Sequence, residues 1–254
     1  MLIPVLLAGW LAGIVVNYLA DVLPGQRRLA KPICLSCGAK QQWRRYLLWP
    51  RRCHQCQASR AKRTYIVEVI FILASLYLWK VNLDGISFLP GLVLAVYFGV
   101  VAVIDIEHRL IMHPVSIVGF VLGVIYGVTL HGLKSTVIGG AVGFASMLLI
   151  YIAGVGYVRL AGWLGRPTDE VALGYGDVNL SGVIGLLLGW PGMGAGLVIT
   201  ILLSGLVSFG YILVMKARKQ YRSDLALPFG PFFVASAVIL IYLKDAIYWI
   251  WRML

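Results

Sequence analysis

Two of the ten acidic residues in this 254-residue chain stand beside long apolar runs rather than in polar loops. Asp105 follows the run VYFGVVAVI, and Asp177 follows Gly174-Tyr175-Gly176 and precedes a second apolar run. A carboxylate at the mouth of an apolar segment is costly to keep there unless it is paired or has a task. Asp105 and Asp177 are therefore candidate functional residues.

Two carboxyl groups a few ångströms apart can catalyse hydrolysis without a metal. In a partly desolvated site they cannot easily both ionise, so they share a proton. One then acts as general base on water while the other protonates the substrate carbonyl or the leaving amine, as in aspartic proteases. Gly174 and Gly176 lack a Cβ atom, so a substrate backbone can approach Asp177 closely. Two alternatives remain open here, namely isolated charges at helix ends and an ion-translocation path.

All four cysteines lie in one loop, as the pairs Cys34-x2-Cys37 and Cys53-x2-Cys56 with fifteen residues between them. This spacing is typical of a zinc ribbon with four thiolate ligands, a closed site that organises a loop rather than performing chemistry. Two disulfides or a redox motif are the alternatives. A cytoplasmic location disfavours structural disulfides, and a redox motif would need a βαβ pattern that the sequence lacks. His54 is a bystander in this interpretation.

The elements that position these residues are membrane spans. The chain is 60% hydrophobic and 13% charged, against about 25% charged in soluble domains, and its apolar runs approach the roughly 20 residues that cross a bilayer. We expect an all-α polytopic membrane protein with about eight transmembrane helices and a small zinc-ribbon-like cytoplasmic loop domain after the first. The expected spans are 2–22, 65–79, 88–104, 114–130, 136–158, 178–190, 194–215 and 231–242.

The distribution of charge predicts the topology. Residues 24–63 contain eleven Lys and Arg and no acidic residue, nearly all of the net charge of +12. A nucleic-acid site is one interpretation of such a patch, but a basic loop between two spans is more simply cytoplasmic and faces anionic lipid headgroups. Alternation then places both termini outside, and both aspartates on the cytoplasmic side with a second basic cluster at 216–222. The tail 244–254 is expected to be interfacial.

Three further features are candidates for supporting the site. Glu68 lies about one turn into the second span, where a carboxylate should be paired or functional. Asn17 in the first span can hydrogen-bond across helices. The segment LPFGPF, which contains Pro228 and Gly230, is expected to form a broken or re-entrant helix start that lines the active site and contacts substrate.

Together these residues resemble the type IV prepilin peptidases, which are intramembrane aspartyl proteases of the GxGD kind. The matching segments, in order, are NYLADVLP at 17–24, the two C-x2-C pairs, YIVEV around Glu68, IDIEHRLIMHP around Asp105, GYGD at 174–177 and LPFGPF at 227–232. The resemblance covers nearly the whole chain, including eight spans. Three places differ: Asn179 stands where the family commonly has Lys, Val22 stands where it has Arg, and the proline that usually follows the first aspartate's motif appears as Met112-His113-Pro114.

The resemblance implies a bifunctional enzyme of the bacterial inner membrane. Such enzymes cleave the basic leader of type IV prepilins or type II secretion pseudopilins at the cytoplasmic membrane face. They then methylate the new N-terminal residue with S-adenosylmethionine. The resemblance implies Asp105 and Asp177 as the catalytic pair, and associates Asn17, Glu68 and the cysteine loop with methylation. The implied partners are prepilins or pseudopilins with hydrophobic N-terminal helices, together with membrane lipids and no nucleic acid.

We expect three parts in the chain: the first transmembrane helix at 1–23, the basic four-cysteine loop at 24–64, and the remaining spans with the peptidase site at 65–254. Two other functions compete with this hypothesis. A proton-coupled transporter would use Asp105 and Asp177 as relay groups, although transporters usually place such charges near the middle of the membrane in repeat-related helices. A non-catalytic assembly protein would hold a partner through the zinc ribbon.

Overall fold

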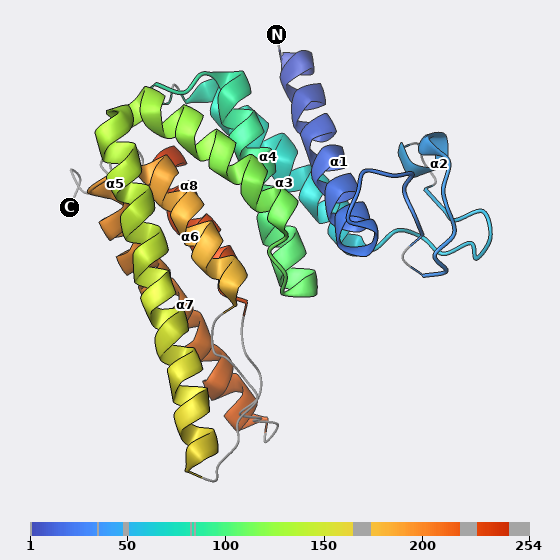
Figure 1. Ribbon diagram of the computed structural model, residues 1–254. Coiled ribbons are helices and arrows are strands. Elements are labelled where there is room, and N and C mark those ends of the chain that lie inside the picture. Colours follow the sequence, from blue (N-terminus) through green and yellow to red (C-terminus); the bar gives the residue numbers. More distant parts are fainter. Residues whose placement is uncertain are drawn as a thin grey trace. The chain divides into compact units, whose positions relative to one another are not determined.

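The computed structural model describes residues 2–34, 36–47, 51–81, 83, 85–164, 174–218 and 228–243. These residues form eight helices and three isolated β-bridges, with no regular strand among them (Figure 1). The predicted all-α fold is therefore confirmed. The tail 244–254 and part of the second basic cluster lie outside the described residues. The chain divides into two compact units, Met1–His108 and Arg109–Leu254.

The first unit contains α1 (Leu2–Gln26), α2 (Trp43–Leu47), α3 (Lys62–Lys80) and α4 (Phe88–His108). Helix α1 packs against both α3 and α4. Two glycines four residues apart on α1 allow the close approach to α3. A Cβ atom at Gly9 would lie 2.7 Å from the carbonyl oxygen of Phe71, and one at Gly13 would lie 2.8 Å from the Cα of Glu68. Small residues at this spacing let membrane helices touch backbone to backbone.

The second unit contains α5 (His113–Trp163), α6 (Tyr175–Leu188), α7 (Gly192–Ala217) and α8 (Gly230–Tyr242). Helix α5 is bent at Gly132, which has φ 77° and ψ 162°, a backbone conformation that glycine adopts without steric penalty. The expected spans 114–130 and 136–158 are thus the two segments of α5. The bend is visible in Figure 1 where α5 changes direction.

Helix α6 forms the buried centre of the second unit, between the two segments of α5. All residues from Leu180 to Leu188 are buried. Glycines of α5 meet its backbone directly: a Cβ atom at Gly127 would lie 2.1 Å from the Leu186 oxygen, and one at Gly139 would lie 2.4 Å from the Gly185 oxygen. No larger side chain fits at these positions without moving a helix.

Four of the described helices, α1, α4, α5 and α7, are long and apolar enough to cross a membrane. Helices α6 and α8 are apolar but shorter, and α3 carries four charged residues among its 19. Each of the eight expected spans lies on one of these helices, with α5 contributing two and α2 belonging to the loop. The protein is therefore a multi-pass membrane protein.

Candidate functional site

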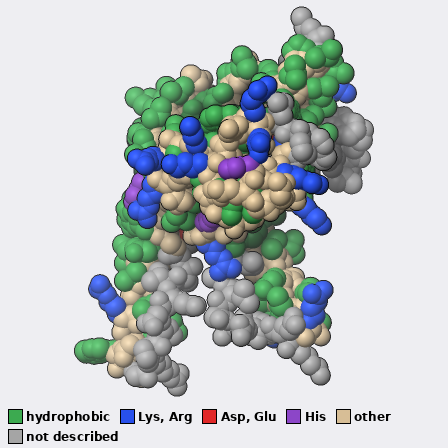
Figure 2. Space-filling model, turned by 90° about the vertical axis from the view of Figure 1, so that its right-hand side faces the viewer, with side chains coloured by type: hydrophobic (Ala, Val, Ile, Leu, Met, Phe, Trp, Pro, Cys, Tyr) green, Lys and Arg blue, Asp and Glu red, His purple; other side chains and the backbone are tan. Residues whose placement is uncertain are grey.

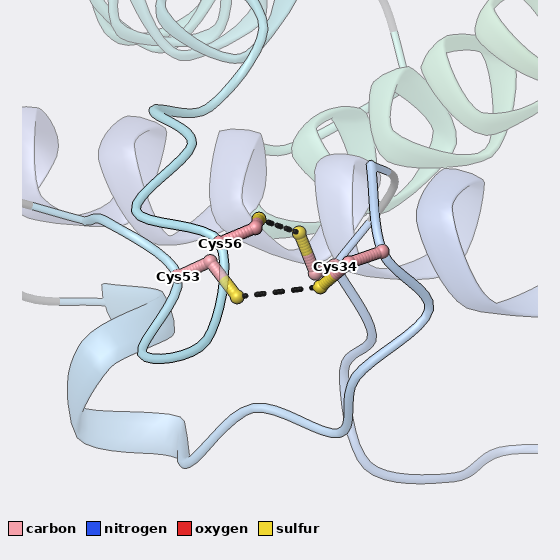
Figure 3. Close-up of side chains that lie close together, drawn as sticks. Cys34, Cys53 and Cys56 are labelled. Atoms are coloured by element: carbon pink, nitrogen blue, oxygen red, sulfur yellow. Dashed lines mark hydrogen bonds between the residues drawn. The ribbon is translucent and has the colours of Figure 1, made fainter.

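The four cysteine sulfur atoms converge in the loop between α1 and α3. Cys34 and Cys56 have their sulfur atoms 3.7 Å apart, Cys37 and Cys53 3.6 Å apart, and all four lie within 4.8 Å of one another. Figure 3 shows the labelled side chains pointing toward one another from two turns. Thiolates held about 2.3 Å from a tetrahedral Zn²⁺ lie about 3.8 Å apart, whereas disulfide sulfur atoms are about 2.05 Å apart. The arrangement fits a structural zinc ion, and all four cysteines are free thiols.

The two C-x2-C pairs lie in turns of the same construction. In each, the backbone N–H of the first cysteine donates to the carbonyl five residues later, at 2.9 Å and 3.0 Å. The residue after the second cysteine is left-handed in both turns, with φ 71° at Gly38 and φ 56° at Gln57. Only the first turn has the glycine that this conformation favours.

The folded turns lower the pKa of two of the thiols, Cys34 and Cys53. Backbone N–H groups of Cys56 and Gln55 lower the pKa of Cys53 to about 6. Burial acts to raise the pKa of Cys34, but backbone hydrogen bonds from the Cys37 turn outweigh it, so this pKa is lowered as well. Because the thiolate is the form that binds metal, the folded turns favour metal binding by themselves.

A second polar cluster lies between α1 and α3 and is centred on Glu68. Arg51 donates to Glu68 at 2.6 Å and Trp10 Nε1 at 3.3 Å, and the side chains of the ion pair are only 7% and 9% exposed. One helical turn away, Asn17 Nδ2 donates to the carbonyl of Thr64 at 3.0 Å, while the buried Oδ1 of Asn17 has no partner. The predicted residues Asn17 and Glu68 thus share one interface.

A third cluster surrounds Asp21 near the end of α1. Tyr46 donates to Asp21 Oδ2 at 2.8 Å, and Arg60 pairs with the same oxygen while its guanidinium lies 3.8 Å from the centroid of the Tyr46 ring. Arg63 pairs with Asp21 Oδ1 and with Glu107. Burial, followed by the negative charge of Asp21, raises the pKa of Tyr46, so its hydroxyl remains a hydrogen-bond donor.

These partners were missed by sequence reasoning, which treated the basic residues of 24–63 as one cytoplasmic patch. Three of the eleven, Arg51, Arg60 and Arg63, turn inward to acidic residues of the helices. The other eight are exposed: Arg27, Arg28, Lys31, Lys40, Arg44, Arg45, Arg52 and Lys62. Figure 2 faces this loop and shows Lys and Arg side chains on its surface, with no acidic side chain in view.

The two candidate catalytic aspartates each lie at the end of an apolar helix, one in each unit. Asp105 is in the last turn of α4 and is 4% exposed. Asp177 is in the first turn of α6 and is half-buried, and its Oδ2 accepts a hydrogen bond of 3.2 Å from the backbone N–H of Gly174. Asp177 therefore caps the N-terminus of its helix. The pairing of the two carboxyls remains a prediction.

The two glycines before Asp177 differ in their surroundings. A Cβ atom at Gly176 would lie 2.8 Å from the Cβ of Ile111, so this glycine is required for packing inside the unit. Among the described residues, the nearest atom to a Cβ at Gly174 would be Asp177 Oδ2, at 3.5 Å. With respect to these residues, Gly174 has more room for a substrate backbone than Gly176.

A groove of about 500 Å³ begins two residues after Asp177, between α5 and α6. Its walls are mostly apolar, including Phe120 and Phe144, and its polar lining includes His113 and Asn179. Asn179 is one of the positions that depart from the pattern described above. The other predicted substrate segment begins α8 at Gly230, two residues after Pro228, while Leu227 lies outside the described residues.

Comparison with known proteins finds one family and several relatives. Residues 92–213, which contain both aspartates, match the model of the type IV leader peptidase family. The prepilin leader peptidase/N-methyltransferase of Pectobacterium carotovorum subsp. carotovorum is 28% identical over 92% of this chain and 88% of the relative. Its namesake in Vibrio cholerae is 28% identical over 84% of this chain and 81% of the relative. That of Aeromonas hydrophila is 26% identical over 79% of this chain and 65% of the relative. No solved structure matches significantly. Residues 92–213 are thus similar to the type IV leader peptidase family, and the chain resembles prepilin leader peptidases/N-methyltransferases along most of its length.

Proposed function

We propose that this protein removes the basic leader of prepilins or pseudopilins at the cytoplasmic face of the bacterial inner membrane and then N-methylates the new N-terminal residue. The observation that carries the peptidase half is the position of Asp105 and Asp177, each at the end of an apolar helix within the family-matched segment. The relatives named above supply the substrate class and the second activity.

The positions of the two aspartates at helix ends suggest which carboxyl acts as the base and which as the acid. A helix N-terminus stabilises negative charge and a helix C-terminus disfavours it. Asp177 lies at an N-terminus and Asp105 at a C-terminus. We assign Asp177 as the carboxylate that removes a proton from the attacking water, and Asp105 as the acid that donates a proton to the scissile carbonyl and then to the leaving amine.

Single substitutions of the aspartates test this proposal. The purified full-length protein is incubated with a substrate that has a basic leader and an apolar helix, and cleavage is followed by mass spectrometry. Asp105→Asn and Asp177→Asn should each abolish cleavage, because each removes one of two required proton-transfer groups. Asp84→Asn, which changes an acid outside the matched segment, is the control. Cleavage by either active-site variant would show that the dyad is wrong.

The groove that begins at Asn179 is the proposed site for apolar side chains of the substrate. It is lined by the same helix that carries the proposed base, and its walls are mostly apolar. Asn179→Lys would introduce a positive charge at the groove and should change kcat/KM between substrates that differ next to the scissile bond. Equal kcat/KM ratios for the variant and the unmodified protein across such a substrate pair would remove Asn179 from substrate selection.

The methylation half rests on the relatives and on the predicted association of Asn17, Glu68 and the cysteine loop with this activity. S-adenosylmethionine would supply the methyl group. The cavity of about 170 Å³ beside Asp21 and Tyr46 is below the roughly 300 Å³ of small-molecule pockets, so it does not fit this donor. Mass analysis of the mature N-terminus, with and without the donor, tests methylation independently of cleavage.

A further inference from the structure

Arg63 connects three helices of the first unit at the end of α4 that carries Asp105. It is the second residue of α3, its Nη2 pairs with Asp21 of α1, and its Nη1 donates to Glu107 of α4 at 3.0 Å. The Arg63 side chain is 16% exposed and the Asp21 side chain only 2%. A single guanidinium thus joins two carboxylates on different helices.

Asp21, the buried partner of Arg63, is also bound by two other side chains. Asp21 uses one carboxylate oxygen for Arg63 and the other for Arg60 and Tyr46. Arg60 is itself stacked on the Tyr46 ring, with its guanidinium 3.8 Å from the ring centroid. Because both oxygens of a buried carboxylate are bound, the position of Arg63 is restricted, and the planar guanidinium directs its remaining N–H groups in fixed directions.

The outer end reaches the residue that lies two positions after Asp105. Glu107 is 35% exposed, and pairs at such a site contribute little to stability. Yet this pair holds the last turn of α4, in which Asp105 is 4% exposed. Because the pair of Arg63 with Glu107 contributes little to stability, its main effect is on the orientation of the last turn of α4 rather than on folding.

We propose that Arg63 and Glu107 are positioning residues for proteolysis, which together fix the last turn of α4 and hence the carboxyl of Asp105. This rests on the proposed function of Asp105 as a proton donor. Displacement of a reacting group by about 1 Å lowers catalysis by up to about 100-fold, so the pair should affect kcat far more than KM or the unfolding temperature.

The test uses the full-length, metal-loaded protein and compares Arg63→Gln, Arg63→Lys and Glu107→Gln, with Lys62→Gln as the neighbouring basic control. Cleavage of a prepilin-type substrate gives kcat and KM, and thermal unfolding reports the fold. We expect Glu107→Gln to lower kcat about 10-fold or more, with little change in KM or unfolding temperature. Arg63→Lys should recover part of the loss of Arg63→Gln, since a lysine keeps the charge without the rigid fork.

The double variant Arg63→Gln/Glu107→Gln should be no slower than the slower single variant, because the two residues act through one contact. Unchanged kcat in Glu107→Gln, while Asp105→Asn is inactive, would overturn the positioning role and leave the proposed function standing. Cleavage by Asp105→Asn would instead remove the proposed function itself. If Arg63→Gln fails to fold because Asp21 loses a partner, the exposed Glu107→Gln variant still decides the question.

Discussion

In the first unit α1 and α3 meet through two glycines and also through charged side chains, whereas in the second α5 and α6 meet through glycines without such ion pairs among the described residues. The first interface contains the pair of Arg51 with Glu68 and the pairs of Arg60 and Arg63 with Asp21. In the second, a Cβ atom at Gly185 would lie 2.2 Å from the oxygen of Gly139. The first interface therefore depends on ion-pair partners from the loop and from the start of α3 in addition to its glycines, and the second on the absence of side chains. Changes of charge should disturb the first unit and leave the second intact.

Removal of the metal is expected to have the largest effect and to be confined to the first unit. Structural zinc contributes about 10 kcal/mol or more to the folding of small zinc domains at neutral pH. A chelator should therefore expose the amides of residues 32–59 to hydrogen exchange and leave those of α5 and α6 protected. Cys56→Ser should have the same effect, whereas His54→Ala, an exposed neighbour, should retain the metal. Equal loss of protection in both units would contradict the comparison.

Neutralising Glu68 should have the next largest effect. Glu68→Gln leaves Arg51 buried without its carboxylate, and breaking a buried ion pair in this way costs about 3–5 kcal/mol. Unfolding by denaturant in detergent would measure this loss. The double substitution Arg51→Leu/Glu68→Leu should regain most of the stability, because replacing both members with apolar side chains is often neutral. If the single and double variants are equally unstable, the pair is not what holds α1 to α3.

A steric change tests the second unit. Gly185→Val places carbon atoms against the α5 backbone at Gly139, and overpacking of this kind costs about 1–3 kcal/mol. Gly205→Ala on α7 is the matched control, since no atom of the described residues lies within 4 Å of its Cβ position. The first variant should unfold more easily and the second should not. Metal content, which reports the first unit, should be unchanged in both.

The smallest expected effect lies within the metal loop, between its two matching turns. Gln57 adopts a left-handed conformation that costs a residue with a side chain about 1–2 kcal/mol, while Gly38 adopts it freely. Gln57→Gly should therefore bind zinc more tightly and Gly38→Ala more weakly, each by roughly tenfold. Competition titration with a chelator of known affinity measures both. A weaker Gln57→Gly site would mean that the Gln57 side chain is needed for other contacts.

The sequence predicted the helices and the cysteine cluster well, because both are encoded locally. Each apolar run predicted as a span lies on a helix, four of these helices are long and apolar enough to cross a membrane, and the two C-x2-C pairs lie close together as their spacing predicted. A turn was expected over residues 131–135, between two of the predicted spans. In the structure only Gly132 leaves the helical conformation, so α5 bends at this one residue.

The ion pairs of the first unit could not be predicted in the same way. Glu68 was expected to be paired or functional, but its partner Arg51 comes from the loop, 17 residues away. Asp21 was treated as an ordinary charge at an interface, and its partners Arg60 and Arg63 lie about 40 positions later. The eleven basic residues have similar sequence surroundings, so the sequence does not indicate which three turn inward to acidic residues. Only the folded structure shows which of them form ion pairs.

The buried polar groups of α1 also set an order for biosynthesis. Asp21 is synthesised 39 residues before Arg60 and 42 before Arg63, and Asn17 is synthesised 47 residues before Thr64. Until α3 has been made, α1 carries a carboxylate and an amide that lipid would penalise. We therefore expect α1 to remain beside the insertion machinery and to enter the bilayer together with α3, as a hairpin. Chains arrested on the ribosome after residue 59 should then crosslink to that machinery more strongly than chains long enough to release α3. The length of the cysteine loop therefore sets the delay between synthesis of α1 and its insertion into the bilayer.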